Sequence, residues 1–399
     1  MGTVASRTWV PGSELGIWKP PAWPLKHTDE LGRAKAFQDG GRWQNPWREG
    51  VPSPIHFFYD WFLAGRDESN IPNKSKLDET LPIKAPTWVG NTDFAPSAAR
   101  MTWLGHATVL AEVEGSTFLT DPVFSSRASA VQFLGPKRFR EAGCEVSDLP
   151  RINAVLISHN HYDHLDLTSA KKLVEKQPWI SWFVPSGTAQ WLTSNTGVSK
   201  ENVKELVWWD EATFEGEQGT SFRMVFTPAN HWCKRSIADD NKCLWGSWAV
   251  IGPNKRFWFG GDTGYCEVFS QIGKELGPFD MAAIPIGAYQ PNWFMKHQHV
   301  HPGEAVQIHK DIKSGRSLGI HWGTFMLTTE YYLEPPVLLT SFMNRLKKST
   351  NTFINPPSKR FPIYGVLLGL SWTHLHLSAQ TLVGQWRLSL GAGWWSQLF

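Results

Sequence analysis

Cysteine is scarce in this sequence: four occur among 399 residues, and none forms a Cys-x-x-Cys pair. This spacing excludes a disulfide-rich scaffold and favours a reduced, intracellular compartment. Long apolar runs are scarce as well. Residues 1–16 contain no apolar stretch of signal-peptide length. The uncharged run from 361 to 386 is interrupted by His374, His376 and Gln380, so we do not expect it to span a membrane.

Acidic residues are missing from the last part of the chain. No Asp or Glu follows Glu334, whereas six Lys and Arg do. The whole chain has 39 basic and 36 acidic residues; removing the six leaves 33 against 36, so residues 1–334 carry a net charge of −3. A nucleic-acid-binding protein would need a basic face on this part, so we expect no nucleic-acid partner.

Composition divides the chain into three parts. Residues 1–95, rich in Pro, Gly and Trp in their first half, predict an extended arm that wraps the body. Within the arm, IHFFYDWFL (55–63) predicts a short apolar helix, either packed on the core or facing a membrane. Residues 96–348 predict the catalytic domain, and residues 349–399 a divergent basic and apolar tail.

Short apolar or β-branched runs predict strands in the catalytic domain. They are residues 101–105, 108–113, 116–120, 152–158, 222–227, 245–251, 256–259, 281–286 and 317–320. Helices are predicted at 166–176, 267–276 and 302–312, the last with Pro302 and Glu304 in its first turn. Strand groups with single helices between them indicate a layered α/β fold.

A cluster of polar residues follows the predicted strand 152–158. Three His and one Asp occupy six positions: His159, His161, Asp163 and His164. Residues i and i+2 leaving a strand project the same way, so His159 and His161 can share one ion. The other two lie in the turn that starts a helix and can face a second ion. Imidazole nitrogen with carboxylate oxygen suits Zn²⁺.

Three more polar residues also follow predicted strands. His231 comes after 222–227, Asp262 after 256–259, and His321 directly after 317–320. A set of solvated histidines would not explain why each one ends a strand. The pattern therefore predicts two metal ions at the strand ends.

Several longer motifs resemble one family. They are TWLGHAT (102–108), FLTDPVFSSRAS (118–129), GPKRFR (135–140), LISHNHYDHLD (156–166), HWCKR (231–235), GDTGYC (261–266) and IHWGTF (320–325). Over residues 40–345 the chain resembles the N-acylphosphatidylethanolamine-hydrolysing phospholipases D of the metallo-β-lactamase superfamily. The resemblance implies an αββα sandwich with two zinc ions per chain. It ends after about residue 348, and the tail is either a membrane-binding addition or the product of an alternative exon or mistaken gene model.

The resemblance also implies roles for the metal residues. The first zinc would be held by His159, His161 and His231. The second would be held by Asp163, His164 and His321, with Asp262 bridging. A metal-bound hydroxide would attack the phosphodiester phosphorus, releasing N-acylethanolamine and phosphatidic acid.

Other motif residues are expected near the metals. Asp121 is expected to orient a ligating His, as such sites commonly need, so it joins Asp163 and Asp262 in the set expected to serve catalysis. His106 has either the same role or that of a buried core histidine. By resemblance Tyr162 and His299 contact substrate.

Two residues, Gln132 and Lys234, fall where the family binds bile acids. Phe133 and Ala238 depart from the family pattern there, which makes this carry-over weaker. Cys233, two residues from a predicted ligand, is expected to be a structural thiol.

The resemblance further implies a membrane phospholipid substrate, peripheral association with Golgi, endosomal or other intracellular membranes, and a homodimer. Two alternatives stay open. One is another reaction on this fold, such as that of a lactonase or nuclease. The other is a lipid- or bile-acid-binding protein inactivated by its altered C-terminus.

Overall fold

The computed structural model describes residues 25–47, 71–88, 99–236, 238–350 and 363–364. The predicted helix at 55–63 and nearly all of the predicted tail lie outside these residues, and the boundaries predicted at 95 and 348 stay predictions. Within the described part, no helix is long and apolar enough to cross a bilayer.

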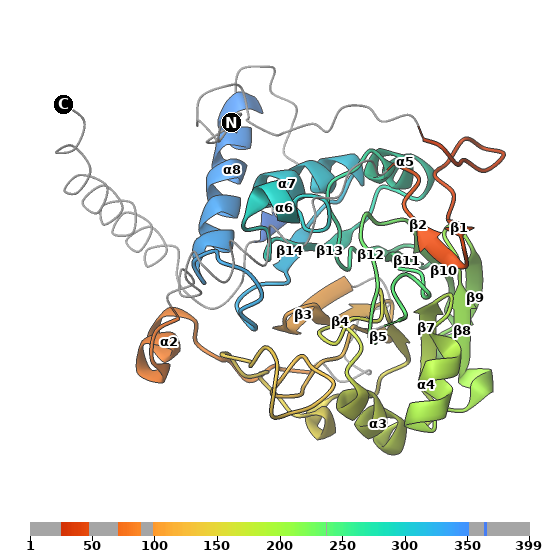
Figure 1. Cartoon of the computed structure of the whole chain (residues 1–399), viewed down its shortest axis with the longest axis horizontal. Helices are drawn as coiled ribbons and strands as arrows, with labels where there is room; N and C mark the ends of the chain where they lie inside the picture. Colours follow the sequence, from red (N-terminus) through yellow and green to blue (C-terminus); the bar gives the residue numbers. More distant parts are fainter. Residues whose placement is uncertain (1–24, 48–70, 89–98, 237, 351–362, 365–399) are drawn as a thin grey trace. The chain divides into compact units, whose positions relative to one another are not determined.

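Two sheets face each other in the middle of the molecule (Figure 1). The first runs in the order β3 (Ala99–Gly105), β4 (Thr108–Val113), β5 (Ser116–Thr120), β6 (Ala154–Leu156), β7 (Ser181–Pro185) and β8 (Val203–Leu206). Its first three strands are antiparallel, and β5 to β8 are parallel.

The second sheet contains the later strands. Its order is β15 (Ile363–Tyr364), β14 (Ser317–Ile320), β13 (Met281–Pro285), β12 (Arg256–Phe259), β11 (Ser247–Ile251), β10 (Ser221–Thr227) and β9 (Glu211–Glu215). Strands β9 to β12 are antiparallel and β12 to β15 parallel. Each sheet thus contains a parallel part, in which the carboxyl ends of several strands share one edge.

Helices cover the outer faces of both sheets (Figure 1). The helices are α2 (Lys74–Thr80), α3 (Leu167–Lys176), α4 (Ala189–Thr196), α5 (Val268–Glu275), α6 (Asn292–Met295), α7 (Pro302–Asp311) and α8 (Glu334–Thr350). Helices α3 and α4 pack on the first sheet, whereas α7 packs on β13 and contacts α5 and α8. The αββα sandwich is therefore confirmed.

Local sequence explains where two of these helices begin. The Asp166 carboxylate accepts from the Thr168 and Ser169 amides, which caps α3 directly after the metal motif. Helix α7 starts with Pro302, and the side chain of Glu304 accepts from the His301 amide in a capping box. Both features agree with the predicted helix starts.

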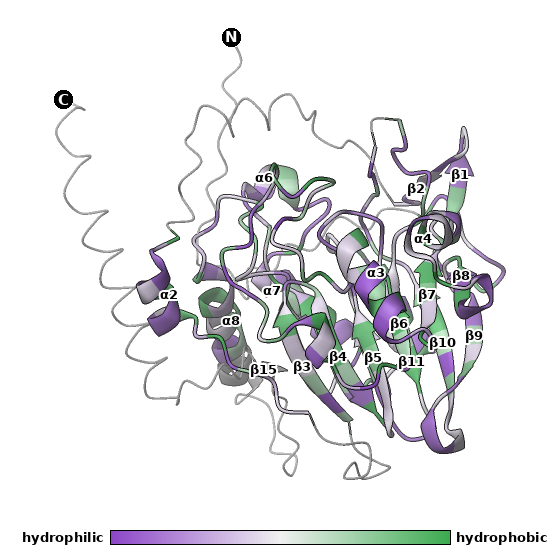
Figure 2. Ribbon diagram, turned by 90° about the horizontal axis from the view of Figure 1, so that it is seen from below, coloured by the Kyte–Doolittle hydropathy of each residue, from purple (hydrophilic) through white to green (hydrophobic). Residues whose placement is uncertain are grey.

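The strands of both sheets are rich in apolar residues (Figure 2), and many of their large aromatic side chains are fully buried. Trp248 of β11 is fully buried against Phe226 and Phe183, and its indole Nε1 donates to the Ile157 carbonyl at 2.8 Å. This bond ties the second sheet to the end of β6, the strand that leads into the metal motif. The tryptophan-rich core therefore also positions the site.

The arm partly forms regular structure. Strands β1 (Phe37–Asp39) and β2 (Arg42–Gln44) make a hairpin where the sequence predicted an extended segment. The described part of the arm contacts the body, because the Trp209 indole donates to the Ala34 carbonyl and the Trp43 amide to the Asn241 carbonyl. Wrapping by the whole of residues 1–95 stays a prediction. The sequence also did not predict the helices α2, α4, α6 and α8 or the strands β7 to β9 and β15, whereas all nine predicted strand runs contain strands.

Candidate metal centre

All seven predicted metal ligands lie at the carboxyl-end edge of the two sheets. His159, His161, Asp163 and His164 follow β6, His231 follows β10, Asp262 follows β12 and His321 follows β14. Main-chain bonds hold the approach to this edge, because the Ile157 amide donates to the Phe183 carbonyl and the Gly246 amide to the Ser158 carbonyl. Side chains distant in sequence therefore converge here, as parallel pairing requires.

Three histidines form a first cluster. The Nδ1 atom of His161 lies 2.8 Å from His159 Nε2 and 3.3 Å from His231 Nε2. These nitrogens are all within 4.8 Å of one another, and the rings of His159 and His231 are nearly perpendicular. Three imidazole nitrogens pointing at one spot match the donor set that zinc commonly takes.

A second cluster contains the Asp163 carboxylate. Its Oδ2 atom lies 3.4 Å from His164 Nε2 and 3.6 Å from His321 Nε2, and His106 Nε2 approaches it at 2.9 Å. Of the four, only Asp163 is more than slightly exposed. One carboxylate and two imidazoles therefore face a second spot, with His106 as a partner of the carboxylate.

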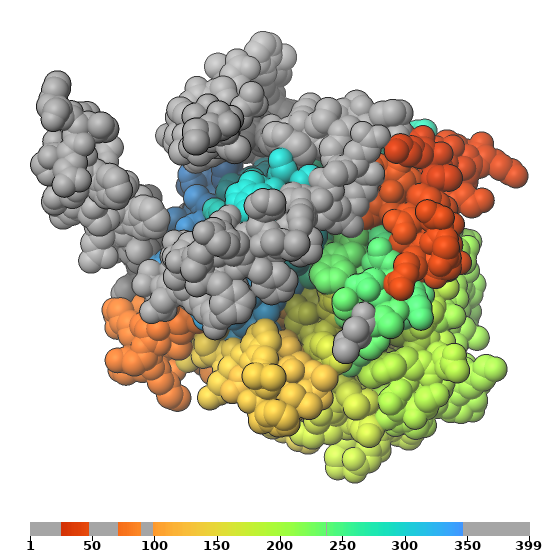
Figure 3. Space-filling model, viewed as in Figure 1, coloured from red at the N-terminus to blue at the C-terminus, as the bar shows by residue number. Residues whose placement is uncertain are grey.

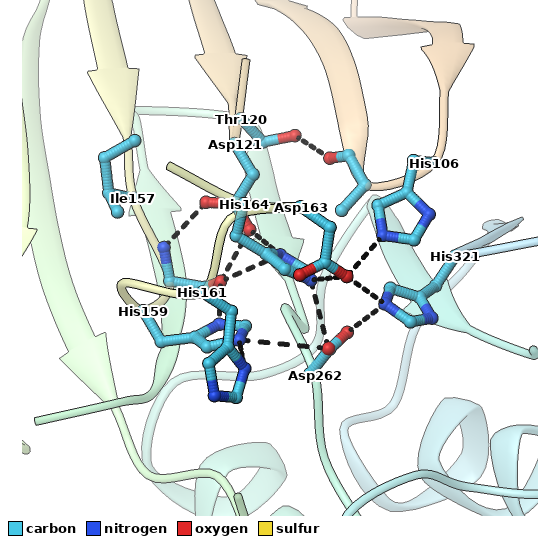
Figure 4. A network of polar contacts seen from close by, with 12 residues as sticks. His106, Thr120, Asp121, Ile157, His159, His161, Asp163, His164, Asp262 and His321 are labelled. Atoms are coloured by element: carbon cyan, nitrogen blue, oxygen red, sulfur yellow. Dashed lines mark hydrogen bonds and ion pairs between the residues drawn. The ribbon is translucent and has the colours of Figure 1, made fainter. Parts of the chain in front are cut away.

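The carboxylate of Asp262 lies between the clusters (Figure 4). Its Oδ2 atom is 3.9 Å from His159 Nε2, 3.7 Å from His231 Nε2 and 3.0 Å from His164 Nε2, while its Oδ1 atom is 3.0 Å from His321 Nε2. Its two oxygens thus reach members of both clusters. This is the placement that a bridging ligand needs.

Among the described residues, several buried polar atoms at this edge make no hydrogen bond, although His321 Nε2 and Asp262 Oδ1 approach each other at 3.0 Å. They include His161 Nε2, His164 Nε2, His321 Nε2 and Asp262 Oδ1. Leaving such atoms unpaired costs about 1–3 kcal/mol each. Cations placed among these atoms would satisfy most of them, so the donor set fits divalent metal ions.

Two of the first-cluster histidines strongly favour the neutral form. Burial, reinforced by neighbouring imidazoles, lowers the pKa of His159 and of His231 well below 6.5. A neutral imidazole keeps the nitrogen lone pair that a metal requires.

The carboxylates give the edge a strongly negative field. Burial opposes charge on His164, yet Asp262 and Asp163 raise its pKa well above 6.5, and they raise that of His321 to about 9. Burial likewise opposes charge on Asp262 and Asp163, but His164 and other nearby imidazoles hold their pKa values well below 3.8. The field therefore favours positive charge at the centre of the site.

Asp121 contacts the clusters on the side away from the Nε2 atoms, and its role in orienting a metal ligand stays a prediction. It is fully buried at the end of β5, and its Oδ2 accepts from His164 Nδ1 at 2.6 Å and from Ser158 Oγ at 2.5 Å. Its Oδ1 accepts from the Ser158 amide, and Ser158 Oγ also contacts His159 Nδ1. These bonds direct the Nε2 atoms of His164 and His159 into the site.

The sequence did not identify Arg235 as part of the site. Its partly buried guanidinium stacks between Tyr162 and Trp191, with Cζ 4.2 and 4.3 Å from the ring centroids. One nitrogen, Nη1, donates to the Asn160 and Leu165 carbonyls at 2.9 and 2.7 Å. Arg235 thus spans the turn that carries the ligands. Its place in HWCKR, four residues after His231, was the available signal.

Asn45 is a second residue that the sequence did not single out. Its amide donates to the His231 carbonyl at 2.9 Å and its Oδ1 accepts from Trp245 Nε1 at 3.1 Å. The arm therefore fixes the backbone of a predicted ligand. Nothing in the local sequence of the arm indicated this contact.

The two predicted substrate contacts lie beside the clusters. His299 is buried with Nδ1 3.9 Å from Asp262 Oδ2, and its ring lies 5.1 Å from that of His321. The Tyr162 hydroxyl donates to the Arg235 carbonyl, so this side chain is also part of the framework. Their contact with substrate stays a prediction.

The two side chains predicted to contact bile acids both bind residues close to them in the chain. Gln132 Oε1 accepts from the Arg127 amide at 3.1 Å, and Lys234 pairs with Asp240 at 2.7 Å. Bile-acid binding stays a prediction. Cys233 is buried and its thiol donates to the Cys243 carbonyl, in agreement with a structural role.

The chain is similar to proteins of known family. The family model "Beta-lactamase superfamily domain" matches residues 116–322. N-acyl-phosphatidylethanolamine-hydrolyzing phospholipase D 1 of Caenorhabditis elegans is 44% identical over 333 residues, covering 80% of this chain and 91% of that protein. The corresponding protein of Saccharomyces cerevisiae, named as mitochondrial, is 32% identical over 74% of this chain and 70% of its own length.

Among solved structures, an isothiocyanate hydrolase from Delia radicum gut bacteria aligns with a TM-score of 0.47 and 17% identity, covering 65% of this chain and 96% of that one. The metallo-hydrolase fold implies a divalent metal, for which the clusters described above are candidate ligands. The chain is therefore a hydrolase that belongs to the N-acylphosphatidylethanolamine-hydrolysing phospholipase D family of the metallo-β-lactamase superfamily.

Proposed function

We propose that the protein is a dizinc phosphodiesterase that hydrolyses N-acylphosphatidylethanolamine to N-acylethanolamine and phosphatidic acid. The observation that carries this proposal is the position of Asp262, whose oxygens approach both ligand clusters. The named activity of the relatives supports the substrate assignment. The net charge of −3 on residues 1–334 disfavours a nuclease, which would need a basic track for its substrate.

The hydrogen bonds indicate which nitrogen each ligand would offer. His231 Nδ1 donates to the Gln298 carbonyl and His164 Nδ1 to Asp121, which leaves Nε2 of both rings for a metal. His159 Nδ1 contacts Ser158 Oγ, with the same consequence. His161 is the exception, because its Nδ1 faces the other nitrogens of the first cluster.

We assign the ligands accordingly. The first zinc would be held by His159, His161 and His231. The second would be held by Asp163, His164 and His321, with Asp262 shared.

When bound, the zinc ions would supply Lewis acidity and lower the pKa of a water molecule to about 7. The chain's own contribution is to hold the ligands rigidly. Asp121 fixes the His164 tautomer, His106 holds the Asp163 carboxylate, and Arg235 holds the turn between them. His299 is buried beside Asp262, and we propose that it contacts the phosphoryl group of the substrate.

The proposal includes partners that follow from the substrate. A membrane phospholipid substrate requires peripheral association with an intracellular membrane. We also propose the homodimer and the bile-acid contacts of Gln132 and Lys234 on family resemblance.

Two measurements test the proposal. Purified protein should contain two zinc ions per chain by elemental analysis. Incubation with N-acylphosphatidylethanolamine should release N-acylethanolamine and phosphatidic acid by mass spectrometry. The Asp262→Ala variant should lose both the bound zinc and the release of products. The His27→Ala variant, altered at an exposed ring outside the site, should keep both.

Four results would overturn it. Zinc well below two per chain would refute the dinuclear centre. Release of free fatty acid alone would refute the bond assignment. Zinc-loaded protein that hydrolyses lactones but no phosphodiester would favour the lactonase alternative, and zinc-loaded protein without any hydrolysis would favour the lipid-binding alternative.

A further inference from the structure

Exposed apolar side chains are concentrated in one loop between β5 and β6. The described residues include eight large apolar side chains that are well exposed, and three of them fall within residues 131–134. Phe133 is 82% exposed, Leu134 67% and Val131 37%. We call residues 131–134 the apolar loop. Side chains exposed singly need no explanation, but such a group commonly marks an interaction surface.

The apolar loop is held in a defined conformation. Gln132 Oε1 accepts from Ser126 Oγ and the Arg127 amide at 3.2 and 3.1 Å, and its Nε2 donates back to the Arg127 carbonyl at 3.1 Å. At the end of the loop Gly135 has φ +103°, and a Cβ there would lie 2.6 Å from that of Ser129. The apolar side chains are therefore presented on an ordered backbone, which lowers the entropic cost of binding.

The segment around the loop is purely basic. Between Asp121 and Glu141 there is no acidic residue, whereas Arg127, Lys137, Arg138 and Arg140 are present. Lys137 is exposed and Arg127 partly exposed, and a backbone bridge joins the two at the base of the loop. An apolar tip above a basic base is complementary to an anionic lipid surface, where acyl chains lie beneath charged headgroups.

This segment is connected directly to the metal centre. Ser125 Oγ donates at 2.7 Å to Asp166, the residue that caps α3 after the metal motif. On the other side of the segment, a backbone β-bridge joins Arg138 to Phe325. The Phe325 ring makes a T-shaped contact with the His106 ring, with 5.2 Å between the ring centroids. In Figure 3 the chain between β5 and β6, gold to yellow, forms part of the face toward the viewer. A surface that engaged lipid here would hold the metal centre next to that lipid.

We propose that the apolar loop inserts Phe133 and Leu134 into the interfacial region of anionic membranes, with Arg127 and Lys137 at the headgroups. The inference rests on the proposed function, because it identifies the surface by which the enzyme reaches a membrane phospholipid. The occupant is lipid rather than a second copy of the chain, because the basic base of the loop would face its own like charge in a symmetric contact.

Vesicle binding of the full-length protein tests the proposal without requiring catalysis. Co-sedimentation should be measured with phosphatidylcholine vesicles, with and without phosphatidylserine. Phe133→Ser and Leu134→Ser should each weaken binding about tenfold, the effect of losing most of one buried apolar side chain. Ala130→Leu, at an exposed position beside the loop, should strengthen binding. Lys137→Gln should weaken binding only to vesicles that contain phosphatidylserine, and less so at high salt.

Leu31→Ser is the matched control, since Leu31 is 72% exposed outside the loop and should leave vesicle binding unchanged. Hydrolysis of detergent-dispersed substrate by the loop variants should stay at the parental rate. Loop variants that bind vesicles like the parent would overturn the proposal. Unchanged vesicle binding together with loss of a dimer by light scattering would assign the loop to a second copy instead. Loop-dependent vesicle binding by a protein that releases no N-acylethanolamine would leave this inference standing and refute the proposed activity.

Discussion

Replacing Asp121 by Asn alters the hydrogen bonds that support the metal centre but leaves all seven proposed ligands in the sequence. Asp121 is fully buried and accepts three hydrogen bonds, from His164 Nδ1, Ser158 Oγ and the Ser158 amide. Asn has nearly the same shape and tolerates the left-handed backbone at this position, where φ is +33°. Its Oδ1 can still accept from the amide, but its Nδ2 would face two donors.

The expected magnitude follows from the lost contact. A hydrogen bond to a buried carboxylate is worth about 1.5–3 kcal/mol. Without it, His164 can shift its proton to Nε2, which would block the nitrogen that faces Asp163 and Asp262. Since about 1.4 kcal/mol corresponds to tenfold in affinity, we expect zinc to bind about 10 to 100 times more weakly, in agreement with the usual effect of such supporting residues.

The assay is competition for zinc between the protein and a chromogenic chelator, combined with the hydrolysis rate at saturating zinc. Asp148→Asn, at an exposed carboxylate that caps a short 3₁₀ helix, is the matched control and should match the parent in both. The Asp121→Asn variant should recover part of its activity as zinc is added. An unchanged zinc affinity would refute the role of Asp121 in orienting His164.

Three further predictions concern Arg235, Trp248 and Glu304. Arg235→Lys should bind zinc about tenfold more weakly, because Lys cannot stack between two rings while it bridges two carbonyls; the d–d spectrum of the cobalt-substituted variant should change, and an unchanged spectrum would contradict the role. Trp248→Phe should lower the free energy of unfolding by about 2–3 kcal/mol in urea, since the Ile157 carbonyl loses its donor; a loss below the error of the fit would contradict this. Burial raises the pKa of Glu304 to about 7, so its protonated form stabilises the fold below pH 4.5 and this contribution is lost as pH rises to about 7. The free energy of unfolding of Glu304→Gln, taken relative to that of the parent, should therefore be higher at pH 8 than at pH 5. An equal difference at both pH values would refute the reasoning.

The strand pattern determined much of the architecture in advance. Runs such as 256–259 and 317–320 were predicted with the observed bounds, because buried strands require continuous apolar residues. Strands β8 and β9 lack such runs, since each contains two charged residues and each lies at one edge of its sheet. The β1–β2 hairpin was not predicted either, because the turn signal at Gly40 and Gly41 stands in a segment without strand periodicity.

For the site, the sequence alone identified the residues that end strands and carry metal-binding atoms. His159, His231 and Asp262 could be named because polar side chains directly after buried strands have few structural explanations. Which atoms meet was decided only by the tertiary structure. The stacking of Arg235 between Tyr162 and Trp191 and the bond from Asn45 to the His231 carbonyl each join segments far apart in the chain. Periodicity and spacing report on neighbours within one element, whereas these contacts arise from the parallel pairing of strands and the packing of two sheets.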